Sequence, residues 1–302
     1  MTRRFSLVAI GAVVLAVLLG GPSLAKASSI LYGATSANGN GGRLYVLNPA
    51  DGSVISDVGP LRTAAGALID LTALAIHPLT GVLYGGTANL GGLRSHLVIV
   101  DPLTAIVTDV GAYGIVSTVT DLAFAANGDL YGWESAGAHR LLGINAGTGV
   151  ATGIGGGIGS AFGGAGLEFD SGGTLYVTPD GVTAANPTLR TVNIGTGITT
   201  TIANLTPDPF QGFNPVINAL SWEAATGLMY GVFTNRGTPA GTRLVTLNLA
   251  TGVLTDLGAA PNDLDAIAFG AAVIPEPATL ALTAAGAALA AFRRRRRGPA
   301  GR

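Results

Sequence analysis

Charged side chains recur at two fixed places in a repeated pattern, and both places could carry chemistry. At the first place, five residues before an Asn or Asp, four of five copies have a basic residue. At the second place, an acidic or amide residue opens an apolar run in four copies. The first set is Arg43, His96, Arg140 and Arg243, with Thr188 in the remaining copy, and the second set is Asp70, Asp121, Asn218 and Asp265.

Three roles fit these two sets of residues. Carboxylate oxygens are the ligands that Ca²⁺ takes in proteins, so Asp70, Asp121 and Asp265 could hold calcium. Carboxylates and Arg side chains also hydrogen-bond sugar hydroxyls. In the third role, the acids pair with the bases and stabilise the repeat itself. We favour this third role, because positions that recur with a repeat usually serve it, and we therefore predict no cofactor.

Few other residues indicate catalysis. The chain has no Cys, three His and no HExxH pair, so thiol and Cys-based metal chemistry are not indicated. Glu168 and Glu223 are the candidates for the carboxylate pair of a polysaccharide hydrolase or lyase, although both align with ordinary repeat positions. Trp222 aligns with core Phe positions, whereas Trp133 begins a loop and is the better candidate for an exposed aromatic that contacts a ligand.

All of these residues lie in a repeat of four short apolar runs, which residues 121–155 show most clearly. Tight Gly-containing turns separate the first two runs and the last two runs, which is typical of β-hairpins. Further copies span residues 70–111, 166–202 and 218–258. A Tyr marks the second run of each copy, at a nearly regular spacing: Tyr84, Tyr131, Tyr176 and Tyr230. The unit is a four-stranded antiparallel meander, and its period predicts a β-propeller.

The two ends of the repeat region supply a fifth copy in two pieces. Residues 30–59 contain the second, third and fourth runs, and residues 264–270 contain only a first run. We therefore predict an all-β, five-bladed propeller whose last blade joins an N-terminal and a C-terminal strand, because closure removes exposed sheet edges. The alternative is an open β-array or solenoid.

Topology predicts that the two faces of such a propeller differ. Tight turns such as residues 145–149 gather on one face, and the long, variable loops gather on the other. Variable loops on a rigid scaffold are the usual place for binding. We therefore place any ligand on the loop face, beside the charged residues and Trp133.

Charge and leader composition indicate an exported protein. The region 28–272 has seven Arg and no Lys against 16 acidic residues, a balance near −9, which is opposite to that of a nucleic-acid binder. Residues 1–27 form a signal peptide, with basic Arg3 and Arg4, an apolar stretch, and Ala25 and Ala27 at a small-x-small cleavage site. Signal peptidase is the expected partner there, through general or twin-arginine export.

The tail, residues 273–302, has three parts. A rigid motif of Pro275, Glu276 and Pro277 comes first, and an uncharged run over residues 278–292 follows. At about 1.5 Å per residue a helix over this run is shorter than a bilayer core of roughly 30 Å. Five consecutive basic residues end it: Arg293, Arg294, Arg295, Arg296 and Arg297. These parts predict an exported domain that a short transmembrane helix holds in a membrane for a time.

This tail resembles the PEP-CTERM sorting signal in the order and position of its parts. The motifs of the sorting signal itself lie only in residues 273–302. It implies a Gram-negative bacterial protein that an exosortase-type membrane protease cleaves near residues 275–277. The family is associated with bacteria that produce exopolysaccharide and form biofilms or flocs. Many of its members carry repeat bodies like this one.

These features together predict an extracellular or cell-surface propeller. We expect a non-enzymatic, monomeric binding or scaffold module in an exopolysaccharide or biofilm matrix, with extracellular polysaccharide as its partner. The alternatives are a polysaccharide hydrolase or lyase and a structural matrix protein without a specific ligand. The ligand itself is not written in the sequence.

Overall fold

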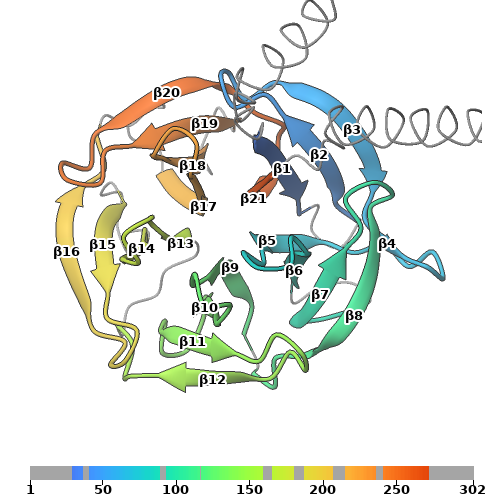
Figure 1. Cartoon of the computed structure of the whole chain (residues 1–302), viewed down its shortest axis with the longest axis horizontal. Helices are drawn as coiled ribbons and strands as arrows, with labels where there is room; N and C mark the ends of the chain where they lie inside the picture. The colour runs from blue at the N-terminus through green and yellow to red at the C-terminus, as the bar shows by residue number, and fades with distance from the viewer. Residues whose placement is uncertain are drawn as a thin grey trace, which may run out of the picture. The chain divides into compact units, whose positions relative to one another are not determined.

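Short apolar runs between Gly-containing turns form strands throughout the chain, as their spacing predicts. A computed structural model describes residues 29–36, 41–88, 93–115, 117–158, 165–179, 187–206, 215–235 and 241–271. Their strands form five antiparallel sheets arranged in a ring around a central axis (Figure 1). This arrangement is a five-bladed β-propeller, which confirms the predicted fold class.

Each blade is named here after its innermost strand. The β21 blade consists of β21 (Leu264–Ala271), β1 (Ser29–Thr35), β2 (Arg43–Leu47) and β3 (Val54–Pro60). The β5 blade consists of β5 (Leu71–Ile76), β6 (Leu83–Thr87), β7 (His96–Val100) and β8 (Ile106–Ala112), with the short β4 (Arg62–Thr63) at its outer edge. The β9 blade consists of β9 (Val119–Phe124), β10 (Leu130–Glu134), β11 (Leu141–Ile144) and β12 (Ala151–Ile154). The β13 blade consists of β13 (Leu167–Phe169), β14 (Leu175–Val177), β15 (Thr188–Val192) and β16 (Thr199–Asn204). The β17 blade consists of β17 (Pro215–Glu223), β18 (Leu228–Asn235), β19 (Gly241–Leu247) and β20 (Leu254–Ala259).

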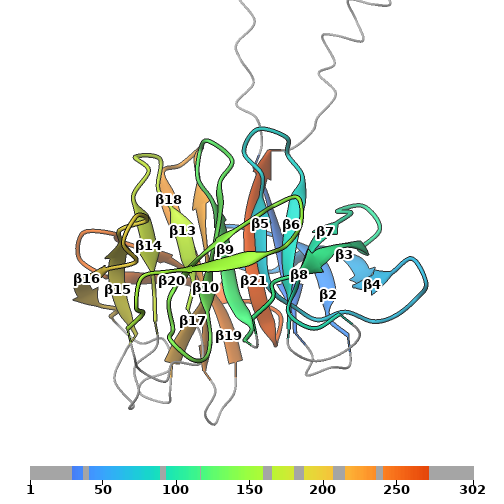
Figure 2. The same ribbon diagram turned by 90° about the horizontal axis from the view of Figure 1, so that it is seen from below.

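The ring is closed by the pairing of its first and last strands. β1 pairs antiparallel with β21 from Ser29 opposite Ala271 to Thr35 opposite Leu264. The two sequence fragments therefore complete one blade, as predicted. The strands of the blades stand side by side around the axis in the side view (Figure 2). At the outer edge of the β5 blade, β4 pairs in parallel with β8.

Aromatic contacts between blades explain why a Tyr recurs in each second strand. Tyr84, Tyr131 and Tyr230 each meet a Phe of the following blade edge-on, with ring centroids 5.3, 5.7 and 4.8 Å apart. The partners are Phe124, Phe169 and Phe269, each near the end of an innermost strand. Edge-to-face aromatic pairs add stability beyond the apolar area that they bury. These three tyrosines therefore help to pack each blade against the next.

Backbone contacts at the rim also join neighbouring blades. A Cβ atom added to Gly149, at φ +79°, would lie 2.3 Å from the carbonyl oxygen of Gly111 in the preceding blade. A Cβ atom added to Gly155 would likewise lie 2.2 Å from the carbonyl oxygen of Thr196 in the following blade. Glycine is needed at Gly149 both for its left-handed backbone and for this close approach. The high Gly content of the chain thus has a structural cause.

The predicted processing residues lie outside the described part of the chain. They are Ala25, Ala27, Pro275, Glu276, Pro277 and Arg293 to Arg297. The signal-peptide and sorting-tail boundaries therefore remain predictions. Within the described ranges, no helix is long and apolar enough to cross a membrane.

Candidate functional site

The basic residues of the third strands contact acidic side chains within their own blades. Three of them pair with an acid on the fourth strand: Arg43 with Asp57 at 2.7 Å, His96 with Asp109 at 2.8 Å, and Arg243 with Asp256 at 2.6 Å. The expected pairing of these bases with the acids of the first strands is therefore wrong. First and third strands are separated by a whole strand in a meander, so the fourth strand is the closer source of carboxylates.

A bulge in the fourth strand brings each acid into reach. In the β17 blade, Leu244 lies opposite Gly258 and the next residue, Val245, lies opposite Asp256, so Leu257 is the extra residue. The β21 and β5 blades have the same irregularity before Asp57 and Asp109. A bulge re-aims the side chains of its strand. The repeated sequence Asp-Val-Gly or Asp-Leu-Gly was the signal that could have identified these acids.

The β9 blade departs from this arrangement. It has Gly153 where the other three have Asp, and its third and fourth strands pair without a bulge. The guanidinium of Arg140 covers Gly153, since a Cβ added there would lie 2.4 Å from its Cζ atom. Arg140 pairs instead with Glu134 at the end of β10, at 3.1 Å. Three of the five blades therefore share the pattern, since the β13 blade has Thr188 in place of a basic residue.

Asp121, one of the acids of the first strands, is a structural link between three blades. Its Oδ1 accepts the N–H of Leu122 at 2.9 Å, and its Oδ2 accepts the N–H groups of Leu167 and Leu220 at 2.8 and 2.9 Å. The side chain is fully buried. Burial raises the pKa of Asp121 well above its usual value, and the three hydrogen bonds act in the opposite direction. Asp121 is therefore not an exposed ligand on the loop face.

The other residues of this inner set are also held by protein groups. Asn218 donates to Asp265 Oδ1 at 2.6 Å and to Thr234 Oγ1 at 3.2 Å. Asp70 is 2% exposed. Among the described residues, no three His, Cys, Asp or Glu side chains gather as metal ligands would. Asp121, Asn218 and Asp265 thus join blades through hydrogen bonds, whereas the basic residues of the third strands pair within their own blades.

The two glutamates of the enzymatic alternative have different surroundings. Glu223 is buried and accepts hydrogen bonds from Ser29 Oγ, from Thr226 Oγ1 at 2.6 Å and from Tyr230 at 3.4 Å. Glu168 lies on β13 and accepts the N–H of Phe169 at 2.8 Å. Burial raises its pKa to about 8. Glu168 is thus a carboxyl that can carry a proton near neutral pH.

The expectation for Trp133 is wrong. Trp133 is the last but one residue of β10 and is 1% exposed, within a core that includes Phe169 and Val177. It pairs with Leu141 across the sheet, so the strand continues where a loop was expected to begin. Trp222, predicted to be core, is partly buried and packs against the cluster around Leu220. The described loop face therefore presents no exposed Trp side chain.

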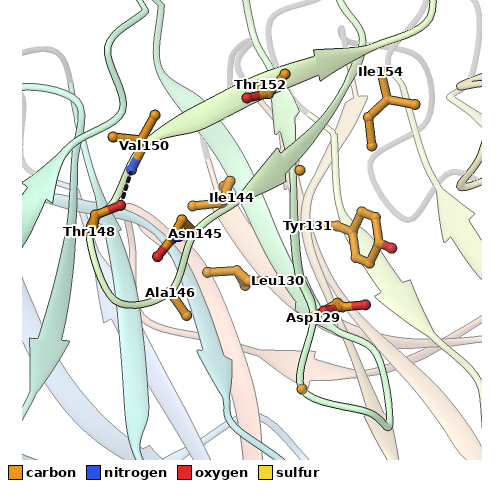
Figure 3. Close-up of a pocket in the computed structure, with 12 residues that line it drawn as sticks. Asp129, Leu130, Tyr131, Ile144, Asn145, Ala146, Thr148, Val150, Thr152 and Ile154 are labelled. Carbon is orange, nitrogen blue, oxygen red and sulfur yellow. Dashed lines mark hydrogen bonds between the residues drawn. The ribbon is translucent and has the colours of Figure 1, made fainter.

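A groove on the β9 blade was not predicted. Its volume is about 760 Å³, and it lies beside the two tight turns of that blade, at residues 127–128 and 145–149 (Figure 3). Its lining residues are Gly128, Asp129, Leu130, Tyr131, Gly143, Ile144, Asn145, Ala146, Thr148, Val150, Thr152 and Ile154. The sequence signal was Gly143, the only Gly at the third-strand position that faces the Tyr of its blade.

Comparison with known proteins finds distantly similar solved structures and no family. No protein-family model matches the chain, and no curated protein resembles it significantly. TolB from Acinetobacter baumannii has 13% identity and a TM-score of 0.49, covering 84% of this chain and 58% of TolB. A gluconolactonase from Xanthomonas campestris has 14% identity and a TM-score of 0.47, covering 80% of each chain. A protein of unknown function from Bacteroides thetaiotaomicron has 15% identity and a TM-score of 0.48, covering 67% of this chain, which spans about half of that protein (53%). At this distance the likenesses carry no argument about function.

Proposed function

We propose that the protein is an exported, extracellular or cell-surface propeller that acts as a non-enzymatic binding or scaffold module in an exopolysaccharide matrix. The observation that carries this proposal is the open groove of about 760 Å³. It lies on a closed ring whose blades are joined by hydrogen bonds. A concave site with a few polar groups on a rigid scaffold is suited to binding. The acidic balance of residues 28–272 keeps such a domain soluble outside the cell.

A cell-fraction experiment tests binding. Polysaccharide from the producing cells is incubated with the full chain and sedimented, and the supernatant is then analysed by size. We expect the protein to sediment with the polymer and the polymer to keep its size. Protein that stays wholly in the supernatant contradicts the binding role and supports a purely structural one.

One observation favours a hydrolase or lyase as the second candidate. The raised pKa of Glu168, about 8, is the property that a general acid needs at neutral pH. Release of oligosaccharides in the same incubation, lost in Glu168→Gln, would support this second function. Glu168 accepts a hydrogen bond from the backbone N–H of Phe169, and Glu223 accepts one from the hydroxyl of Thr226. These bonds favour a structural role for both glutamates.

Export and trimming form a separate part of the proposal. It rests on the leader and on the resemblance of the tail, and it names signal peptidase and an exosortase-type protease as partners. Mass spectrometry of the extracellular protein should find an N-terminus near Ser28 and a C-terminus near residues 275–277. Recovery of extracellular protein that retains Arg293 to Arg297 would refute the trimming.

A further inference from the structure

We propose that the groove of the β9 blade binds one or two rings of a neutral polysaccharide against Tyr131. The proposal names the ligand class for the binding role given above and rests on it. It places the ligand on the tight-turn side of the ring, away from the variable loops where binding is usually sought.

The groove exists because one side chain is absent beside a tyrosine. Tyr131 lies directly opposite Gly143, which in turn lies opposite Thr152, so the three share one face of the sheet. The corresponding tyrosines in the other blades face side chains: Val46, Ile99, Thr191 and Thr246. Directly opposed side chains are separated by only about 5 Å at Cβ. Gly143 therefore uncovers the flank of the Tyr131 ring.

Gly143 has room for a larger side chain, and its backbone conformation does not require glycine. A Cβ added to Gly143 would meet only Ile154 Cδ1, at 3.5 Å, which is normal contact. No left-handed backbone requires a glycine there, since Gly143 is not among the residues with positive φ. Neither a turn nor a close approach of backbones explains this Gly. Space for a ligand does.

The polar groups around the ring have hydrogen-bonding capacity to spare. Asp129 is exposed, and its Oδ2 accepts from Asn127 at 2.8 Å while its Oδ1 has no partner among the described residues. Asn145 Oδ1 accepts the N–H of Gly147 at 2.9 Å, which leaves its Nδ2 atom for a ligand. Thr152 is exposed as well. In Figure 3, Asp129 lies near Tyr131, and Asn145 lies across the groove from them.

This set of groups matches vicinal hydroxyls. A carboxylate only accepts hydrogen bonds, an amide nitrogen only donates them, and the hydroxyls of Thr152 and Tyr131 do both. A sugar ring presents alternating O–H donors and acceptors around apolar C–H surfaces. Tyr131 and Ile154 offer apolar contact for those surfaces, and the ring of Tyr131 offers it at low entropic cost. The groove is therefore complementary to a pyranose.

The charge of the groove excludes anionic ligands. None of its lining residues is basic, and Asp129 is acidic. Arg140 lies over Gly153, whose cross-strand partner is Leu142, so it belongs to the opposite face of the sheet from Gly143. Phosphates and uronate polymers would meet repulsion without a compensating cation. The ligand that fits is uncharged.

Filling the groove is the direct test. The full chain and its variants are titrated by calorimetry with maltohexaose and cellohexaose as neutral probes and with hexagalacturonate as an acidic one. Gly143→Val places in this blade the side chain that Val46 supplies in the β21 blade, so it should fold with a melting temperature at least equal to that of the wild type. Thr191→Val, at the matching position of the β13 blade, is the control.

We expect at least one neutral probe to bind and the acidic probe not to bind. Gly143→Val should weaken binding at least tenfold, Asp129→Asn severalfold, and Thr191→Val not at all. Equal binding by the wild type and by folded Gly143→Val overturns the groove but leaves a binding role elsewhere on the propeller. Binding of the acidic probe alone, or of neither neutral probe, overturns the ligand class, while co-sedimentation with native polymer decides the binding role separately.

Discussion

The carboxylate of Asp121 accepts the backbone N–H of Leu220 at 2.9 Å, although 99 residues separate the two along the chain. The same oxygen accepts the N–H of Leu167 in the blade between them. One side chain near the axis thus satisfies backbone groups of three innermost strands. Its recurrence in sequence suggested a ligand or an ion pair, and its actual partners are main-chain groups.

Replacing Asp121 should strongly destabilise the ring. Asp121→Ala leaves three N–H groups without their acceptor, each worth about 1–3 kcal/mol when buried and unsatisfied. We expect the free energy of unfolding in urea to fall by roughly 3 kcal/mol or more, and by less in Asp121→Asn, which keeps one acceptor oxygen. A loss in Asp121→Ala no larger than that of an ordinary surface substitution would mean that these bonds do not hold the blades together.

Protonation of Glu168 should make stability depend on pH. Its pKa in the folded protein, about 8, lies above its ordinary value of 4.5 because of burial. A raised folded-state pKa gives a contribution to stability that is complete below about pH 4.5 and is lost as the pH rises through about 8. The unfolding free energy of the wild type should therefore decline from pH 5 to pH 8.5, by on the order of 3 kcal/mol.

Glu168→Gln is the control for this pH dependence. It keeps an acceptor oxygen for the N–H of Phe169 and cannot ionise. Subtracting its pH profile from that of the wild type removes the effects of other titrating groups. Parallel profiles for the two proteins would contradict the assignment.

Two glycines of the same turn should differ in how much stability is lost when each is replaced by Ala. Gly149→Ala combines a left-handed backbone with a Cβ only 2.3 Å from Gly111 O, so it should cost at least about 2 kcal/mol. Gly147→Ala, two residues earlier, meets only Asn145 Oδ1 at 3.4 Å and should change stability by less than about 0.5 kcal/mol. Similar melting temperatures for both variants would show that the rim contact is dispensable.

Ring closure can be tested by deletion and by reconnection. Deleting residues 264–271 removes β21 and exposes the apolar edge of β1, so we expect an insoluble chain. A circular permutant that joins Ala271 to Ser29 through a short turn, with new ends between Ile158 and Ala165, should fold, since the joined residues are cross-strand partners. A soluble deletion variant with an unchanged melting temperature would contradict closure.

Sequence spacing was enough to predict the blades, their number and their closure. Apolar runs, Gly-containing turns and the Tyr spacing report local geometry, and Tyr131 lies in the second strand of its blade as its repeat position predicts. The site was harder to predict. The partner of Arg243 depends on a bulge that shifts Asp256 by one residue, and Trp133 is buried by contacts from the next blade. The groove depends on a missing side chain at Gly143, a signal that only appears once Tyr131 and Gly143 are known to face each other.

The closing pair of strands also determines when folding of the ring can be completed. Ser29 and Ala271 pair although they are the first and last residues that the structure describes, so the contact order of the final sheet is high. The other four blades contain only strands that are close in sequence, whereas β1 keeps one edge unpaired until β21 is available. The last step is therefore slow and aggregation-prone, and a prematurely terminated chain cannot become a ring.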